Sequence, residues 1–135
     1  MKRLFLDANV LFTAAHNPRG KAALLIALAA DGHWQVVTSD LAIAEAHRNL
    51  ERKYPDCLGA LQALLLTVER CPSDLTLYAS PALPAKDRPI FASSIATGAT
   101  HLLTGDLKHF GPYMNQPEAC NNVIIQTVSQ FLESV

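Results

Sequence analysis

The chain has 135 residues, enough for one domain with a single sizeable core; half of them are hydrophobic and 17% are charged. This balance excludes an intrinsically disordered chain, and a formal net charge of -1 argues against a protein that coats nucleic acid through bulk positive charge. We therefore expect one globular domain over residues 1–135.

The first half of the chain alternates apolar strand patterns with helix patterns. Leu4-Phe5-Leu6 predicts a buried strand that ends in a turn at Asp7-Ala8-Asn9. The Ala- and Leu-rich segment from Lys21 to Ala30 predicts a helix, and the β-branched run from Gln35 to Thr38 predicts a second strand. This part of the chain therefore reads as strand, helix, strand.

Two further helices are expected before a proline-rich connection. Ser39 or Asp40 can cap a helix that ends before Pro55, and another helix spans Leu58 to Glu69. The segment from Pro81 to Pro84 marks the longest irregular connection.

The second half continues the alternation. Asp87 and Pro89 mark a helix start that leads into Ile90 to Thr97, followed by a strand from His101 to Thr104. Val123 to Ile125 predicts a last strand before a terminal helix. Short apolar strands alternating with helices indicate an α/β fold with a parallel sheet covered on both faces.

Neither a membrane span nor an export signal is expected. The longest apolar stretch, Ala22 to Ala30, is shorter than the roughly 20 residues that a spanning helix needs. The three cysteines, Cys57, Cys71 and Cys120, are odd in number and lack a CxxC spacing, which favours reduced thiols over disulfides or a zinc site. We expect a cytoplasmic protein with no membrane partner.

Four acidic residues are predicted to meet at the carboxyl edge of the sheet. Asp7 and Asp106 each follow a strand pattern, Glu45 lies in the first turns of a helix after the second strand, and Asp87 begins a helix. In a parallel α/β sheet these strand ends and helix starts open on one edge, where ligands bind. Carboxylates this close repel one another unless cations neutralise them.

The donor set predicts a hard divalent cation and chemistry at phosphorus. Oxygen ligands without His or Cys favour Mg²⁺ or Mn²⁺ over zinc, and such ions promote in-line displacement at phosphate. We assign metal-ligand and catalytic roles to the four acids, and supporting hydrogen bonds to Asn9 and Thr104. Taken alone, Asp87 is more often a helix cap, Glu45 a solvated helix residue and Asp7 part of an ordinary turn, so the prediction depends on their shared position.

These residues resemble the PIN-domain family over essentially the whole chain. The resemblance rests on Leu6 to Val10, on Glu45 within Ser39 to Glu45 and, most specifically, on the stretch from Lys86 to Asp106. It implies a PIN-like three-layer α/β/α fold with a central parallel sheet, a metal-bound acidic pocket and endoribonuclease activity. The family includes the toxin ribonucleases of bacterial and archaeal toxin-antitoxin pairs, so the resemblance implies a toxin of this kind.

The resemblance extends residue by residue, with one departure. The family's acidic positions match Asp7, Glu45, Asp87 and Asp106, and its polar supports match Asn9 and Thr104. Many members carry an Asp or Asn just before a Phe where this chain has His109-Phe110. The number of bound metals stays open, as does whether His109 contacts the scissile phosphate or is a surface residue.

Basic residues near the expected ligands are candidate RNA contacts. They either bind phosphates flanking the cut or serve as solvated surface charge: Arg48, Lys86, Arg88 and Lys108. Few aromatic residues lie near the site in sequence beyond Phe110 and Tyr113, so no RNA sequence is predicted as substrate.

Two helices are unusually apolar for solvent-facing elements. Lys21 to Ala30 and Leu58 to Glu69 either pack entirely into the core or bury surface on a second chain. In the related family such surfaces serve homodimers and bind a small antitoxin, so the resemblance implies both partners.

Three other functions were weighed against the ribonuclease. A phosphatase of the haloacid dehalogenase type needs a second Asp where this chain has Asn9, and a receiver domain needs a late-strand Lys where it has Asp106. The remaining alternative is a non-catalytic PIN-like module that binds RNA or a partner. The intact set of four acids favours the enzyme.

Overall fold

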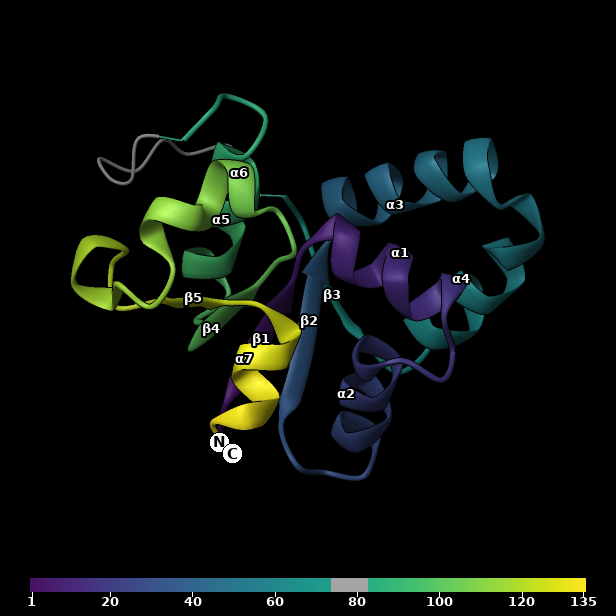
Figure 1. The fold of residues 1–135 in the computed structure, drawn as a ribbon, viewed down its shortest axis with the longest axis horizontal. Helices are drawn as coiled ribbons and strands as arrows, with labels where there is room; N and C mark the ends of the chain where they lie inside the picture. Colours follow the sequence, from purple (N-terminus) through teal and green to yellow (C-terminus); the bar gives the residue numbers. More distant parts are fainter. Residues whose placement is uncertain (74–82) are drawn as a thin grey trace.

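Five parallel strands form the central sheet of the computed structural model, which describes residues 1–73 and 83–135 (Figure 1). Within these residues the strands lie in the order β3-β2-β1-β4-β5, and every neighbouring pair is parallel. They are β1 (Arg3–Leu6), β2 (Gln35–Ser39), β3 (Glu69–Cys71), β4 (His101–Leu103) and β5 (Ile124–Gln126). The predicted α/β fold class is confirmed.

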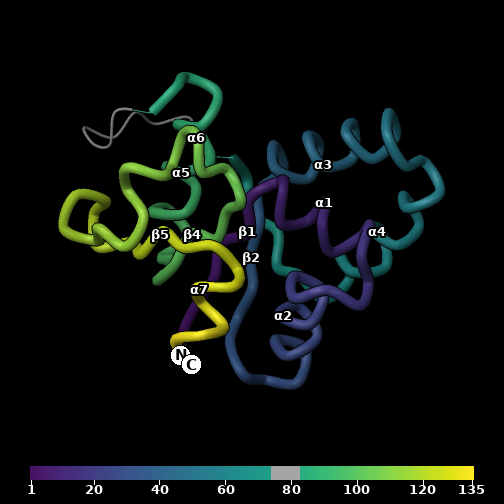
Figure 2. The backbone as a smooth tube through the Cα atoms, viewed as in Figure 1, coloured from purple at the N-terminus to yellow at the C-terminus, as the bar shows by residue number. Residues whose placement is uncertain are grey.

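Helices cover both faces of this sheet. They are α1 (Ala8–His16), α2 (Lys21–Ala30), α3 (Asp40–Lys53), α4 (Leu58–Leu65), α5 (Arg88–Ala96), α6 (Leu107–Phe110) and α7 (Val128–Glu133), with short 3-10 turns η1 (Pro55–Cys57), η2 (Gly111–Tyr113) and η3 (Pro117–Ala119). Helices α1 to α4 lie on one face and α5 and α6 on the other, while α7 packs beside α2 (Figures 1 and 2). Among the described residues, no helix combines the length and apolarity needed to cross a bilayer.

The central strand is buried on both sides. Leu4, Phe5 and Leu6 of β1 have no exposed surface, and Leu102 and Leu103 of the neighbouring β4 are equally buried. Such continuous apolar runs are typical of parallel strands covered by helices on both faces. Each fully buried Leu or Phe side chain contributes roughly 1.5–3 kcal/mol to stability, so the register of β1 is firmly fixed. This fixes the point at which Asp7 leaves the sheet.

The turn predicted at Asp7-Ala8-Asn9 is instead the start of α1. Asp7 takes the extended N-cap conformation, and its side chain accepts a hydrogen bond from the Ala8 amide. Val10 and Phe12 have low intrinsic helix propensity, so propensity gives little indication of α1. Packing decides in favour of a helix, since Val10 and Leu11 are buried and α1 contacts α2, α3 and α4.

The helix predicted from Leu58 to Glu69 is too long. It ends at Leu65, and Glu69–Cys71 forms β3, which pairs in parallel with β2. Val68 is buried just before the strand. A three-residue edge strand with two exposed charged side chains has no apolar alternation to reveal it. Of the expected Pro81 to Pro84 connection, residues 81–82 lie outside the described residues.

The free edges of the two outer strands, β3 and β5, differ in charge and in how far they are covered. Glu69 and Arg70 of β3 are exposed and charged. The outer side of β5 is partly covered, because Met114 forms a β-bridge with Ile125 and the Asn115 amide donates to the Ile125 carbonyl at 2.9 Å.

Candidate functional site

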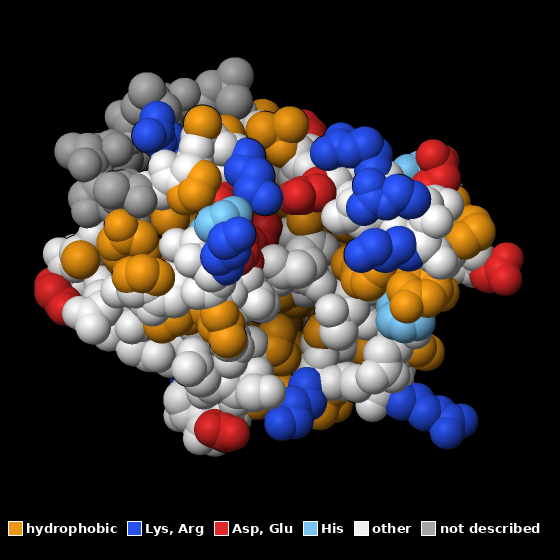
Figure 3. All heavy atoms as spheres, turned by 45° about the horizontal axis from the view of Figure 1, so that its top comes forward, with side chains coloured by type: hydrophobic (Ala, Val, Ile, Leu, Met, Phe, Trp, Pro, Cys, Tyr) orange, Lys and Arg blue, Asp and Glu red, His pale blue; other side chains and the backbone are white. Residues whose placement is uncertain are grey.

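The carboxyl ends of the strands bring the four predicted acids to one pocket. Asp7 directly follows β1 and Asp106 lies three residues beyond β4, its neighbour in the sheet. Glu45 lies in the second turn of α3, which begins directly after β2, and Asp87 immediately precedes α5. All four side chains line the same pocket. Figure 3 shows acidic side chains in a hollow of this face, with Lys and Arg side chains around it.

Asp7 is the most enclosed of the four acids, with only 5% of its surface exposed. One carboxylate oxygen accepts from the Ala8 amide at 2.7 Å, and the other accepts from the Thr104 hydroxyl at 2.8 Å. Burial raises the pKa of Asp7 to about 6, although the bonds from Thr104 and Ala8 lower it; the charges of Glu45 and Asp87 add to the rise. Near neutral pH, burial therefore disfavours the charged form of Asp7 more than its hydrogen bonds stabilise that form.

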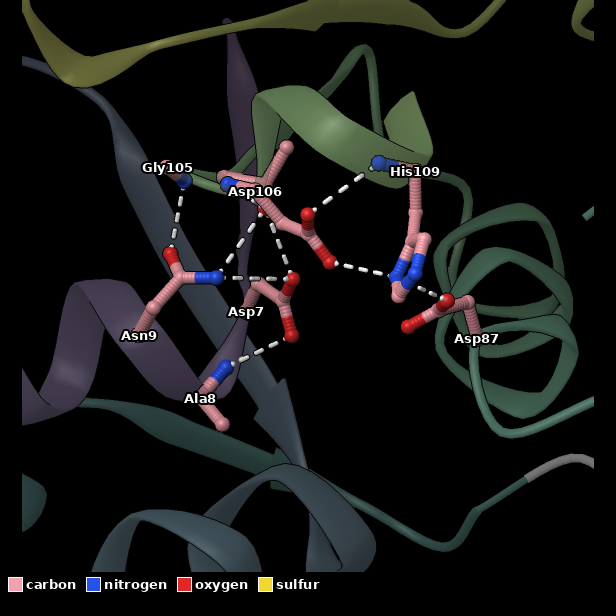
Figure 4. Close-up of polar contacts among 8 residues, drawn as sticks. Asp7, Ala8, Asn9, Asp87, Gly105, Asp106 and His109 are labelled. Carbon is pink, nitrogen blue, oxygen red and sulfur yellow. Dashed lines mark hydrogen bonds and ion pairs between the residues drawn. The ribbon is translucent and has the colours of Figure 1, made fainter. Parts of the chain in front are cut away.

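Thr104 and Asn9 join the Asp7 and Asp106 segments in one hydrogen-bond network (Figure 4). The buried Thr104 hydroxyl accepts from the Asn9 side-chain amide at 3.2 Å and from the Asp106 backbone amide at 3.1 Å. The Asn9 side-chain oxygen accepts from the Gly105 amide at 2.7 Å. Both residues predicted as supports thus contact the segments that carry the acids.

His109 lies between Asp87 and Asp106 (Figure 4). Its Nδ1 atom is 2.9 Å from Oδ2 of each carboxylate, while its backbone amide donates to Asp106 Oδ1 at 3.1 Å. The distances are those of ion pairs, but the directions are not those of hydrogen bonds. Within the described residues, the buried atoms Asp87 Oδ2 and His109 Nδ1 have no hydrogen-bond partner. One atom from each of the three residues lies within 4.8 Å of the others, a spacing that can hold a metal ion.

Burial also dominates the electrostatics of Asp87. Burial raises the pKa of Asp87. The nearby charges of His109 and Lys86 lower that pKa, and the charges of Asp106 and Glu45 raise it further. The predicted mutual repulsion of the acids contributes to both pKa values, and for Asp7 and Asp87 the loss of water on burial contributes more. Asp87 occupies the N-cap position of α5 without a side-chain capping bond, so capping does not account for its carboxylate.

A family model described as PIN domain matches residues 3–108, which include all four acids. The chain belongs to the PIN-domain family. The match confirms the resemblance predicted from the sequence. His109 lies one residue beyond the matched segment.

Solved structures share the PIN fold of this chain. It is similar to a chain of VapBC2 from Rickettsia felis bound to a promoter DNA fragment, with 17% identity, a TM-score of 0.65, and coverage of 93% of this chain and 98% of that chain. It is also similar to Mycobacterium tuberculosis VapC20, a toxin that cleaves the sarcin-ricin loop, with 18% identity and a TM-score of 0.55. That match covers 78% of this chain and 92% of that chain. A chain of DNA-bound VapBC from Salmonella typhimurium is 17% identical with a TM-score of 0.65, and the match covers 95% of this chain and 99% of that chain. No curated protein sequence matches at a significant level.

The predicted basic residues of this PIN domain take different positions. Lys86 lines the acidic pocket, whereas Arg48, Arg88 and Lys108 are exposed outside its lining. The Arg88 Nε atom donates to the Leu83 carbonyl at 3.0 Å, so part of its side chain fixes the segment before α5.

Sequence reasoning missed one wall of the pocket. Phe12 and Thr13 of α1, and Asn49 and Lys53 of α3, line it together with the acids. Asn49 and Lys53 follow Glu45 by four and eight residues, so helical spacing from Glu45 identifies them.

The aromatic residues near the pocket also differ from those expected. Phe110 is fully buried, and neither it nor Tyr113 lines the pocket. The Phe12 ring instead lies 5.9 Å from the Tyr54 ring, and Tyr54 stacks on His16 at 3.9 Å with an angle of 11° between the rings.

Proposed function

We propose that this PIN domain is a metal-dependent endoribonuclease in which Asp7, Glu45, Asp87 and Asp106 hold a divalent cation, Mg²⁺ or Mn²⁺. The observation that carries the proposal is the convergence of four carboxylates from distant segments on one pocket. Burial opposes the charged form of two of them, which a bound cation would stabilise.

The residues present fit such an ion. Asp87 Oδ2 is buried and lacks a hydrogen-bond partner among the described residues, and carboxylate oxygens are ligands that Mg²⁺ and Mn²⁺ prefer. When bound, the cation would supply positive charge to the scissile phosphate and to the oxygens of an in-line displacement. Thr104 and Asn9 keep the Asp7 carboxylate in one orientation. Lys86 and Lys53, at the rim, are placed to bind flanking phosphates.

RNA is the proposed substrate because cationic and aromatic side chains adjoin the pocket. The Lys53 ammonium lies 5.9 Å from the Phe12 ring centroid, and the Phe12 ring is close to the stacked pair of Tyr54 and His16. Arg48 is exposed on the same helix as Lys53, and Arg88 and Lys108 are exposed near Asp87 and Asp106. Aromatic rings beside a basic surface bind unpaired bases, which favours a single-stranded or looped RNA.

Tyr54→Ala is expected to weaken binding of single-stranded RNA by roughly five- to thirty-fold, because one stacked base contributes about 1–2 kcal/mol. Tyr54 suits this test because 42% of its surface is exposed and accessible to a base. The measurement is fluorescence anisotropy with a labelled single strand and its duplex, in an Asp106→Asn background that leaves the RNA intact.

Tyr54→Phe is the matched control, since it keeps the ring and removes only the hydroxyl. We expect the affinity of Tyr54→Phe for the single strand to lie within twofold of the affinity of the protein that keeps Tyr54. Equal affinities for Tyr54→Ala and Tyr54→Phe would show that bases do not stack here.

A toxin-antitoxin role is the proposed biological setting. Structures of similar fold include VapBC complexes from Rickettsia felis and Salmonella typhimurium. In this chain α2 buries only Ala22, Leu25 and Ile26, and Leu24 on its outer side is half exposed. A shallow apolar groove between α2 and α4 is lined by Ala14, Pro18, Ala23, Ile26, Ala60, Ala63 and Leu64. We assign these helix surfaces to a homodimer and to a cognate antitoxin.

Cleavage of a mixed labelled RNA pool by purified protein tests the proposed enzyme. We expect cleavage with Mg²⁺ or Mn²⁺, and its loss both in EDTA and in an Asp7→Ala, Asp106→Ala double variant. If folded, metal-loaded protein binds RNA and leaves the whole pool intact, the chain is a non-catalytic binding module instead.

A further inference from the structure

His109 occupies an unusual position between two carboxylates of the proposed centre. Its Nδ1 atom lies 2.9 Å from Oδ2 of both Asp87 and Asp106, and its side chain is only 22% exposed. An imidazole nitrogen has a single in-plane direction for a lone pair or a proton, so it can bond well to one of the two oxygens at most. Here it bonds to neither, since Nδ1 lacks a hydrogen-bond partner among the described residues.

The same geometry suits three atoms that share one ion. Two donor atoms that each lie about 2.1 Å from a metal, at right angles, are about 3 Å apart. Both contacts of His109 Nδ1 have nearly this length. The bond from the His109 amide to Asp106 Oδ1 leaves Asp106 Oδ2 facing the imidazole (Figure 4).

We infer that His109 Nδ1 is itself a ligand of the divalent cation and makes the site favour Mn²⁺ over Mg²⁺. This inference rests on the proposed metal centre and goes beyond it, because the four acids alone provide only oxygen. Imidazole nitrogen binds transition metals more readily than it binds Mg²⁺, which prefers oxygen and retains its waters. Neutral His109 supplies the lone pair, and the adjacent carboxylates supply the negative charge.

His109→Asn is the sharpest substitution to test this ligand. Both side chains carry a polar atom directly on Cγ, so the Asn oxygen can take the place of Nδ1. The change thus exchanges a nitrogen donor for an oxygen donor at one position. His33→Asn is the matched control, because His33 is exposed and packs beside Trp34, away from the pocket.

The experiment is calorimetric titration of the metal-free full chain with Mn²⁺ or Mg²⁺, together with pulsed electron paramagnetic resonance of the Mn²⁺-loaded protein. We expect a histidine ¹⁴N coupling to Mn²⁺ in the unsubstituted protein and in His33→Asn, and its loss in His109→Asn. We also expect His109→Asn to lower the ratio of Mn²⁺ to Mg²⁺ affinity by about tenfold.

The failures of this inference and of the proposed function are distinguishable. Bound Mn²⁺ without a ¹⁴N coupling in the unsubstituted protein overturns the inference and leaves the carboxylate centre standing, and this readout needs no variant to fold. An unchanged affinity ratio in folded His109→Asn also overturns it. Absence of Mn²⁺ and Mg²⁺ binding overturns both.

Discussion

Asp7→Asn is expected to abolish RNA cleavage while making the metal-free protein more stable at neutral pH. Asp7 is buried, and its pKa is raised to about 6 chiefly by that burial. A buried charge without a cation costs stability, and a neutral amide of the same shape avoids that cost although it offers one acceptor oxygen in place of two. The loss of a ligand carboxylate should reduce cleavage on the order of a thousand-fold.

The direction of the stability change follows from how the protonation of Asp7 depends on pH. The folded-state pKa of Asp7 lies above the value of 3.8 for an unperturbed carboxyl, so between these two values the folded chain binds more protons. Stability from Asp7 therefore decreases as pH rises from about 4 to about 6, and the full cost, roughly 3 kcal/mol, is present above that range. Asp7→Asn removes this cost, so its advantage should be near zero at pH 4 and largest at pH 7.5.

Urea denaturation in EDTA at the two pH values measures the free energy of unfolding directly. Asp56→Asn serves as the control because Asp56 is exposed, and we expect little change from it at either pH. Added Mg²⁺ or Mn²⁺ should stabilise the chain that keeps Asp7 more than the Asp7→Asn protein, because the substitution removes one charged ligand. A less stable Asp7→Asn protein at pH 7.5 in EDTA would contradict the electrostatic account of this residue.

Thr104→Val is expected to damage the site without touching any proposed ligand. The fully buried Thr104 hydroxyl donates to Asp7 and accepts from Asn9 and from the Asp106 amide. Valine has nearly the same shape but leaves these groups short of a partner, at a cost of about 1–3 kcal/mol. Cleavage should decrease about 10- to 100-fold because the Asp7 and Asp106 segments are no longer held together.

Thr104→Ser separates the hydroxyl from the methyl group in this experiment. It keeps the hydroxyl and should retain most of the cleavage rate, whereas Thr104→Val should also move the pKa of Asp7 upward, since the Thr104 bond lowers it. Rates for the two variants within threefold of each other would show that the network does not position the acids.

The sheet and the acids at its edge could be predicted because burial leaves a strong pattern in the sequence. β1 contains the apolar run Leu4-Phe5-Leu6 and β4 contains Leu102-Leu103, so the positions of Asp7 and Asp106 just beyond them followed from the topology of parallel sheets. β3 left no such pattern, because two of its three residues are exposed and charged. Its pairing with β2 is decided by tertiary contacts.

The aromatic side of the pocket could not be predicted because the sequence pattern at Asp7-Ala8-Asn9 indicates a turn and gives no sign of α1. Phe12 reaches the pocket only because Asp7 begins a helix, which places Phe12 on the same face as Asn9. Tyr54 joins it across the α1 and α3 interface, a contact between residues forty-two positions apart. The role of His109 was equally hidden, because its distances to Asp87 and Asp106 depend on how α5 and α6 meet.

The character of the two sheet edges limits how copies of this chain can associate. An open edge invites strand pairing between molecules, and proteins prevent such pairing with short, charged or covered edge strands. β3 is short and displays Glu69 and Arg70, while β5 is partly screened by Met114 and Asn115. Continuation of the sheet from one molecule to the next is therefore disfavoured at both ends, which protects against fibrous aggregation and directs self-association to the helical surfaces.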